Sequence, residues 1–430
     1  MYFYEDSIYQ LNRSIASQNN HHDVQTWLSA AIADEQTCLN GFLDFDLPPY
    51  ISIQSSSFMQ INLLSKLLSN ALSICKAVSP SPSANGNRRL MAGDFPEWVS
   101  VGDRNLLQSS DTPRKADIVV ARDGSGDYTT ICEGLNAAAT ARARSGGKRC
   151  VVYVKRGVYK ENVVVKKFMK NVMLVGDGID ATIVTGSKNV RDGFSGFGSA
   201  TFAVTGDAFI AQGITFENTA GPEKHQALAL FSSSDLSVFY RCSFKGYQDT
   251  LCGHSHRQFY RDCDIYGTID FIFGFSASVI QNCNIYLRQP MPHQKNTITA
   301  QGRRDPNEQT GIIIHNSHIT RAPGNTGTSF QSYLGRPWRE YSRTVFIKCV
   351  IDDVIDPAGW LPWSGDFALA TLYYGEYMNT GAGADTSQRV KWPGVHIISS
   401  ANKVEEFTVV SFLKGNSWLP ATGVPFTPGL

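Results

Sequence analysis

The sequence predicts an all-β protein built as a parallel β-helix and preceded by a short, incomplete α-helical segment. From about Ala116 onward, short runs rich in β-branched and aromatic residues alternate with Gly, Asn and Asp. A degenerate motif also recurs about every 20 residues, which is typical of a solenoid whose coils stack on one another. An antiparallel sandwich is the structural rival, but it predicts no fixed period.

Three segments follow from the pattern along the 430 residues. Residues 1–78 place apolar side chains at three- and four-residue intervals over 24–42 and 58–76, which predicts amphipathic helices joined around Pro48-Pro49. Residues 79–115 form a polar linker. Residues 116–430 form the solenoid, in which the sequence predicts one longer helix, over 133–144.

Composition excludes several classes of protein. Charged residues make up 18% and hydrophobic residues 42% of the chain, with 37 Gly, so disorder and coiled coil both fit badly. The formal charge of +1 gives no sign of nucleic acid or of an anionic membrane surface as a partner. No apolar run approaches the roughly 18 residues of a membrane span. The N-terminus also lacks the basic start and apolar stretch of a signal peptide.

The recurring motif brings cysteines into register. Cys242, Cys263 and Cys283 recur at the period of the motif, whereas the cysteines as a whole lack the spacing of a zinc site, so no metal is expected. Stacked coils would bring the α-carbons of Cys263 and Cys283 within the roughly 4.4–6.8 Å that a disulfide needs, and we predict that bridge. Cys252 is the candidate free thiol, and the pairing of the others stays open. The motif reads Tyr240-Arg-Cys-Ser-Phe244, Tyr260-Arg-Asp-Cys-Asp-Ile265, Ile280-Gln-Asn-Cys-Asn-Ile285 and Ile314-His-Asn-Ser-His-Ile319.

Nearly the same period aligns two carboxylates and two amides. Gln226, Gln248 with Asp249, and Asp270 follow one another at intervals of about one coil, so they should form a short ladder on one face. Two carboxylates one coil apart cannot both ionise cheaply, which favours one proton donor and one anionic nucleophile. The amide groups could donate to an oxyanion. On spacing alone, a purely structural interpretation explains the pattern equally well. In this interpretation the Asp residues cap turns between coils, and the amide side chains form a structural ladder.

A later segment adds a cation and an aromatic ring. Arg336 could hold a carboxylate ionised, and Trp338 offers a flat surface for a sugar ring. A surface Arg and a packed Trp are the alternative interpretation of these two residues.

These motifs resemble, in order, the motif series of plant pectin methylesterases. The resemblance covers about residues 118–430 and implies a right-handed parallel β-helix that hydrolyses the galacturonate methyl esters of pectin. Methanol would be released without a cofactor. The motifs are Gly157-Val-Tyr-Lys-Glu161, Phe216-Glu-Asn-Thr-Ala-Gly-Pro222, Gln226-Ala-Leu-Ala-Leu230, Gln248-Asp-Thr-Leu251, Asp270-Phe-Ile-Phe-Gly274 and Leu334-Gly-Arg-Pro-Trp338.

The resemblance also implies roles for single residues. Asp270 would be the nucleophile, and Asp249 the proton donor and later the base. Gln248 would stabilise the transition state, with Gln226 supporting it and contacting substrate. Arg336 would position Asp270. Trp338 would bind the galacturonate chain of pectin.

Segment 1–78 resembles part of the inhibitor-like pro-region of such enzymes, and Arg88–Met91 resembles their processing site. The helical segment is shorter than a complete inhibitor bundle, and the leading signal sequence of the family is missing. The family implies a secreted, monomeric cell wall enzyme that acts on pectin, with a proteinaceous pectinesterase inhibitor as a further partner. Neither nucleic acid nor a membrane is expected as a partner.

Two departures from the family pattern flank the carboxylates. Cys252 stands where an aromatic residue is usual, and Phe275-Ser276 replaces the usual Asn-Ala. Two rival functions stay open at this stage. A β-helix with paired carboxylates also suits a pectic glycoside hydrolase or lyase, and the departures at positions 252 and 275 would suit a pectin-binding protein without catalytic activity.

Overall fold

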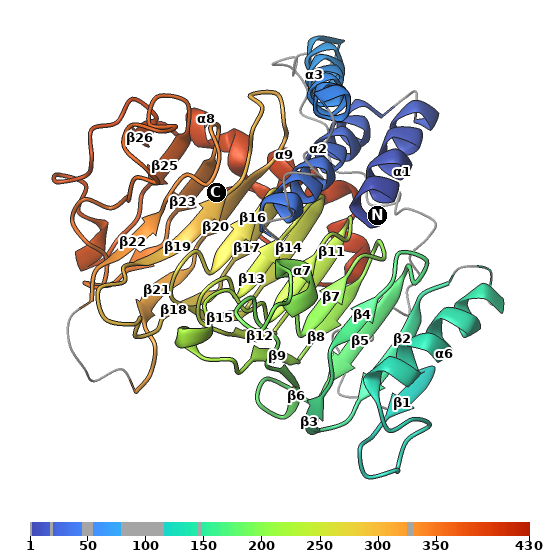
Figure 1. Cartoon of the computed structure of the whole chain (residues 1–430). Helices are drawn as coiled ribbons and strands as arrows, with labels where there is room; N and C mark the ends of the chain where they lie inside the picture. Colours follow the sequence, from blue (N-terminus) through green and yellow to red (C-terminus); the bar gives the residue numbers. More distant parts are fainter. Residues whose placement is uncertain are drawn as a thin grey trace. The chain divides into compact units, whose positions relative to one another are not determined.

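The structure is a computed structural model (Figure 1) that describes residues 2–17, 20–44, 55–78, 116–144, 146, 148–324 and 330–430. Its contacts separate the chain into two compact units. One unit holds the three N-terminal helices and the segment Arg303–Thr310, and the other holds every strand of the described residues. The predicted linker 79–115, its processing site and the Pro48-Pro49 junction lie outside the described residues.

The N-terminal unit consists of α1 (Tyr2–Ala16), α2 (His21–Asp44) and α3 (Ser55–Val78). The apolar intervals predicted α2 and α3, while α1 was missed. Because residues three and four apart share one face of a helix, the apolar side chains of α2 and α3 form a small core. Its buried members are Leu28, Ala31, Ile32, Leu68 and Leu72. None of the described helices is long and apolar enough to cross a membrane.

The second unit begins with one strand and a capped helix. Helix α6 (Ile131–Arg144) starts at a capping box, in which Glu133 N–H donates to Thr130 Oγ1 (3.2 Å) and Thr130 N–H donates to Glu133 Oε2 (3.3 Å). The helix predicted at 133–144 is thereby confirmed. The remaining short helices are α7 (Gly196–Ser199), η2 (Pro222–Lys224), η3 (Ala382–Ala384), α8 (Ala401–Val404), η4 (Glu405–Phe407), α9 (Val409–Leu413), η5 (Gly415–Ser417) and η6 (Leu419–Thr422).

Three sheets, in which all strand pairs are parallel, make up the rest of this unit (Figure 1). Sheet A contains β1 (Ile118–Val120), β2 (Cys150–Val154), β5 (Val172–Gly176), β8 (Ile210–Gln212), β11 (Ser237–Tyr240), β14 (Arg257–Arg261), β17 (Ala277–Gln281), β20 (Gly311–His315), β23 (Arg343–Ile347), β25 (Tyr373–Tyr377) and β26 (Val395–Ile397). Sheet B contains β3 (Gly157–Lys160), β6 (Thr182–Gly186), β9 (Thr215–Asn218), β12 (Ser243–Lys245), β15 (Asp264–Gly267), β18 (Asn284–Leu287), β21 (His318–Arg321) and β24 (Val350–Ile351). Sheet C contains β4 (Val163–Val165), β7 (Phe202–Val204), β10 (Leu230–Ser232), β13 (Leu251–Gly253), β16 (Ile272–Gly274), β19 (Asn296–Gln301) and β22 (Ser332–Gly335).

From β2 to β22 the chain passes through sheets A, B and C in turn, so that each of these coils adds one strand to each sheet, and the predicted parallel β-helix is confirmed. The recurring sequence motif is the corner between sheet A and sheet B. Phe244 pairs with Ile265, Ile265 with Ile285, and Ile285 with Ile319, which is the predicted register. The residue at each corner has a left-handed conformation, as at Arg241 (φ 49°), Asp262 (φ 52°), Asn282 (φ 55°), Asn316 (φ 50°) and Lys348 (φ 51°).

Sheet A is buried on both faces. Its inward side chains join the interior core, in which the rings of Phe239 and Tyr260 stack with centroids 5.0 Å apart. Its outward side chains form a second apolar cluster with the C-terminal segment, including Val409 and Leu413 of α9. Burial on both faces explains why the strands of sheet A read as continuous runs of β-branched residues.

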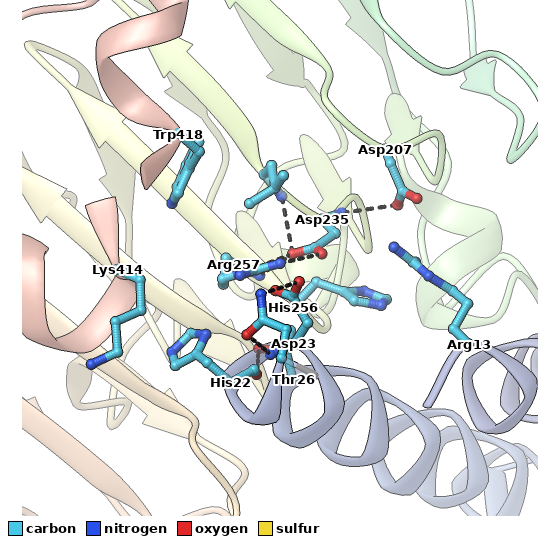
Figure 2. Close-up of polar contacts among 12 residues, drawn as sticks. Arg13, His22, Asp23, Thr26, Asp207, Asp235, His256, Arg257, Lys414 and Trp418 are labelled. Carbon is cyan, nitrogen blue, oxygen red and sulfur yellow. Dashed lines mark hydrogen bonds and ion pairs between the residues drawn. The ribbon is translucent and has the colours of Figure 1, made fainter. Parts of the chain in front are cut away.

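The corner between sheets C and A is braced by a buried ion pair (Figure 2). Arg257 donates through Nε to Asp235 Oδ1 (3.0 Å) and through Nη2 to Oδ2 (2.8 Å), and the two side chains are 6% and 2% exposed. Asp235 N–H in turn donates to Asp207 Oδ1 (3.3 Å) one coil earlier. Bidentate pairing offsets part of the cost of burying both charges.

Cys263 and Cys283 lie in adjacent coils as free thiols, and the disulfide predicted between them stays a prediction. Cys263 Sγ donates to the carbonyls of Phe239 and Arg261 (3.3 Å each), and Cys283 Sγ donates to Gln281 O (3.4 Å). The two residues are neighbours, since Cys263 N–H donates to Cys283 Sγ (3.3 Å). Cys252 is also a free, buried thiol, as are the other buried cysteines.

Candidate active site

The predicted carboxylate and amide side chains lie on the turns that lead from sheet B into sheet C. Gln226 precedes β10, Gln248 and Asp249 precede β13, and Asp270 precedes β16. Ala227 N–H donates to Gln248 O (3.3 Å), and Asp249 N–H donates to Ile269 O (3.1 Å), so the three turns stack directly. The structure therefore brings together the four residues that their spacing had aligned.

Both aspartates occupy the same backbone position. Asp249 (φ 62°) and Asp270 (φ 50°) adopt the left-handed conformation, which Asp tolerates better than most residues. Thr250 holds the first turn by donating to Tyr266 O (2.9 Å). Such strained positions in adjacent coils fix the direction of both carboxylates.

Arg288 supports the turn of Asp249 from outside. Its Nη1 donates to Gly246 O (2.8 Å), and its guanidinium lies 4.4 Å from the ring centroid of Tyr247. The residues that it contacts come just before Gln248. The sequence analysis did not identify Arg288, because its position just after β18 gives no motif at the carboxylate spacing.

Two side chains bind the oxygens of the Asp270 carboxyl group. Arg336 Nε donates to Oδ1 (2.8 Å), and Arg336 Nη2 donates to Oδ2 (2.6 Å). Thr297 Oγ1 donates to Oδ1 (2.6 Å) and accepts from Asp270 N–H (2.9 Å). The Asp270 side chain is only 8% exposed, and its pairing with Arg336 is bidentate and charge-assisted.

Asp249 has the opposite electrostatic environment. Burial raises its pKa well above the usual range, and the negative charge of Asp270 raises this pKa further. Arg336 opposes both effects without cancelling them. Because burial and a neighbouring anion both disfavour the charged form, Asp249 keeps its proton at pH values where an ordinary Asp has lost it.

Aromatic rings gather around the loop after β22. Arg336 N–H donates to Thr299 O (3.0 Å), and the Arg336 guanidinium lies 4.4 Å from the ring centroid of Trp363. The ring of Trp338 meets that of Phe273 edge to face, with centroids 5.9 Å apart. Trp363 is 38% exposed and was missed by the sequence analysis, although its position in Trp360-Leu-Pro-Trp363 would have been a usable signal.

Thr297 was also missed, and its spacing explains why. It lies one coil after Asp270 but 27 residues along the chain, because a longer loop joins β18 to β19. A search at the period of the recurring motif passes over it. Within the described ranges, no group of three or more His, Cys, Asp or Glu side chains is arranged to hold a metal ion.

Comparison with known proteins gives two family matches. The family model "Pectinesterase" matches residues 117–416, which include every strand and side chain of the site described above. The chain belongs to the pectinesterase family. A second model, "Plant invertase/pectin methylesterase inhibitor", matches residues 2–74.

Individual relatives of this pectinesterase agree with the family match. "Probable pectinesterase/pectinesterase inhibitor 6" of Arabidopsis thaliana is 56% identical over 99% of this chain and 80% of the relative. "Pectinesterase 2" of Citrus sinensis is 55% identical with the same coverage. Pectin methylesterase from carrot is 54% identical with a TM-score of 0.71, covering 73% of this chain and 98% of the carrot chain. The Aspergillus niger enzyme, solved in deglycosylated form, is 32% identical with a TM-score of 0.61, covering 70% of this chain and 95% of its own. Family and fold thus identify a carboxylic ester hydrolase, a pectin methylesterase.

Proposed function

We propose that this chain hydrolyses the galacturonate methyl esters of pectin with Asp270 as nucleophile and Asp249 as acid and base. The observation that carries the proposal is the unequal environment of the two carboxylates. Asp270 is paired with Arg336 and Thr297, whereas burial and the charge of Asp270 keep the pKa of Asp249 high. One group is thereby prepared to attack and the other to give up a proton.

In the first step a carboxylate oxygen of Asp270 attacks the ester carbonyl carbon, and the carbonyl oxygen becomes an oxyanion. The Gln248 amide donates to this oxyanion, and Gln226, on the preceding coil, supports Gln248 and contacts substrate. The tetrahedral intermediate then collapses, the bond to the methoxy oxygen breaks, and Asp249 transfers its proton to that oxygen. Methanol leaves, and an anhydride joins the substrate to Asp270.

The second step restores the enzyme. Asp249, now an anion, takes a proton from water, and the resulting hydroxide attacks the anhydride at the acyl carbon of the substrate. The bond between that carbon and the Asp270 oxygen breaks. Free galacturonate is released, Asp270 returns to its pairing with Arg336, and Asp249 is protonated again.

Trp338 and Arg336 have different tasks in this scheme. Trp338 offers a ring face to the galacturonate chain. The guanidinium of Arg336 is bound to Asp270 and lies against Trp363, so it acts mainly by orienting the nucleophile and stabilising its charge. No cofactor takes part.

Location and partners follow from the relatives rather than from the site. We propose a secreted, monomeric enzyme of the plant cell wall with methyl-esterified pectin as its substrate. The match of residues 2–74 to an inhibitor family supports a regulatory N-terminal segment that is removed near Arg88–Met91, and a separate inhibitor protein as a partner.

The test is a product assay on purified protein with highly methylated pectin, before and after cleavage following Met91. Methanol should appear without new reducing ends or unsaturated products, and its rate should rise on cleavage. Reducing ends or ultraviolet-absorbing products in place of methanol would indicate a glycoside hydrolase or lyase. Pectin binding without any product across a pH series would indicate a catalytically inactive binding protein.

A further inference from the structure

Trp338 rests on a set of residues that we call the Trp338 seat: Phe273, Phe275 and Gly302. The rings of Phe275 and Trp338 are tilted by 40° with centroids only 4.7 Å apart. Phe273 meets the same indole edge to face. Trp338 itself lies in a loop and is half-buried, so contacts with these rings fix its orientation.

Phe275 is fixed by the β-helix rather than by the loop. It follows Gly274 at the end of β16, its N–H donates to His254 O (3.2 Å) on the preceding coil, and its side chain is 3% exposed. Because the buried ring of Phe275 is anchored to the stacked coils, it provides a rigid surface against which Trp338 of the loop packs.

Gly302, on the next coil, makes room for both rings. A Cβ atom at this position would lie 2.6 Å from two ring carbons of Phe275 and 2.9 Å from Cε3 of Trp338. Any side chain here would push the two rings apart. The backbone of Gly302 is held against the preceding coil, since its N–H donates to Gly274 O (2.8 Å).

Phe275 also contacts a second ring. His254 meets Phe275 edge to face with centroids 5.9 Å apart, and Phe231 lies 5.0 Å beyond His254. Burial, followed by the nearby His256, lowers the pKa of His254 to about 3. His254 therefore stays neutral over the working range of most enzymes and does not introduce a charge under the seat.

We propose that Phe275 is a positioning residue that presents the indole of Trp338 to the pectin chain. The proposal deepens the function given above, because it rests on Trp338 as a substrate-binding surface. Phe275 stands where the family resemblance leads us to expect Asn, so the seat is a property of this chain. An Asn side chain lacks a ring to support the indole and would bring a polar group to a buried position.

The effect should fall on substrate binding. Arg336, two residues before Trp338, is anchored independently to Asp270 and to Thr299 O, so loosening the indole leaves the nucleophile in place. A ring that is already oriented loses less freedom when it binds substrate, and this lowers KM rather than raising kcat.

The experiment is a double-mutant cycle on the full chain, with methanol release from methyl-esterified pectin as the readout. Phe275→Asn should raise KM by roughly 3- to 10-fold with kcat changed less than about 2-fold. Phe275→Leu keeps most of the apolar volume, so its KM should rise much less than that of Phe275→Asn. In a Trp338→Ala background, Phe275→Asn should have no further effect on KM. Phe426→Asn is the matched control, since Phe426 packs against Phe259 on the outer face of sheet A, away from sheet C.

An unchanged KM in Phe275→Asn, or an equal rise of KM in the presence and absence of Trp338, would overturn the proposal. A second readout separates this outcome from failure of the proposed function. The fluorescence of Trp338, taken as the difference between each protein and its Trp338→Phe variant, should shift to longer wavelength in Phe275→Asn as the indole loosens. If the wild type released no methanol but this shift occurred, the proposed function would be wrong, whereas the positioning of Trp338 by Phe275 would be supported. An unshifted spectrum would contradict the positioning of Trp338 by Phe275, whether or not the wild type is active.

Discussion

Two corners of the same β-helix use one backbone device for different purposes. At the corner between sheets A and B, Asp262 adopts a left-handed conformation and pairs with its neighbour Arg261 (3.0 Å). At the corner between sheets B and C, Asp270 adopts the same conformation and pairs with Arg336. The Asp262 side chain is 32% exposed and that of Asp270 is 8% exposed.

The difference lies in what covers each carboxylate. Arg261 is adjacent in sequence and contacts one oxygen of Asp262, whose side chain stays partly open to water, so screening reduces the net energy of the pair. Arg336 comes from 66 residues further along the chain and binds both oxygens of Asp270. The left-handed turn thus sets the direction of a carboxylate, while groups from later coils decide whether it can do chemistry.

The largest difference between the two corners is expected when each of these two aspartates is replaced by Asn. Asp270→Asn should lower methanol release by roughly 10⁴-fold or more, because the nucleophile is lost. Asp262→Asn, at an equivalent turn, should leave activity unchanged and alter the free energy of unfolding by less than about 0.5 kcal/mol. The measurements are initial rates of methanol release and thermal unfolding of each variant. A folded Asp270→Asn protein with near-wild-type turnover would contradict the assignment.

Replacing Arg336, which comes from a later coil, tests why Asp270 differs from Asp262. Arg336→Gln should lower kcat/KM by roughly 10²-fold or more, since it leaves a buried carboxylate without its charged partner. Arg336 lowers the pKa of Asp249, so without the cation Asp249 holds its proton to higher pH and the basic limb of the pH profile should move to higher pH. The profile of kcat/KM against pH checks both effects. A uniformly lower Arg336→Gln profile, with its basic limb in place, would argue for a role in substrate binding alone.

A smaller effect is expected from the hydroxyl that also holds Asp270. Thr297→Val keeps the shape of the side chain but removes the hydrogen bond to Oδ1, which should cost roughly 10- to 100-fold in kcat. Thr297→Ser keeps the hydroxyl and should retain most of the activity. Steady-state kinetics of the two variants give the comparison. Equal losses in both would mean that the methyl group, and hence packing, matters more than the hydrogen bond.

The sequence predicted those features that follow the repeat. The period of the recurring motif predicted the parallel β-helix, the register of the A–B corner and the stacking of Gln248, Asp249 and Asp270. Apolar intervals predicted α2 and α3, and the helical stretch at the start of the solenoid predicted α6. These features depend on local sequence and on one regular translation along the helix axis.

Features that depend on irregular coils could not be predicted in this way. Thr297 follows a long loop and so falls outside the period. The contact between Phe275 and Trp338 joins a coil to a loop far along the chain, which no periodicity reports. The period correctly placed Cys263 next to Cys283, and the bridge predicted between them stays a prediction.

The central claim is that the two carboxylates carry different protonation states, and a direct titration of Asp249 tests it. Protein labelled with ¹³C at the aspartate carboxyl groups is followed by NMR across pH, and the Asp249 signal is assigned by its loss in Asp249→Asn. We predict a pKa well above the ordinary Asp value of about 3.9, because of burial and the charge of Asp270. In Asp270→Asn this pKa should fall but stay raised, since burial remains. An Asp249 signal that titrates in the ordinary range, or one that does not respond to the removal of the Asp270 charge, would contradict the account.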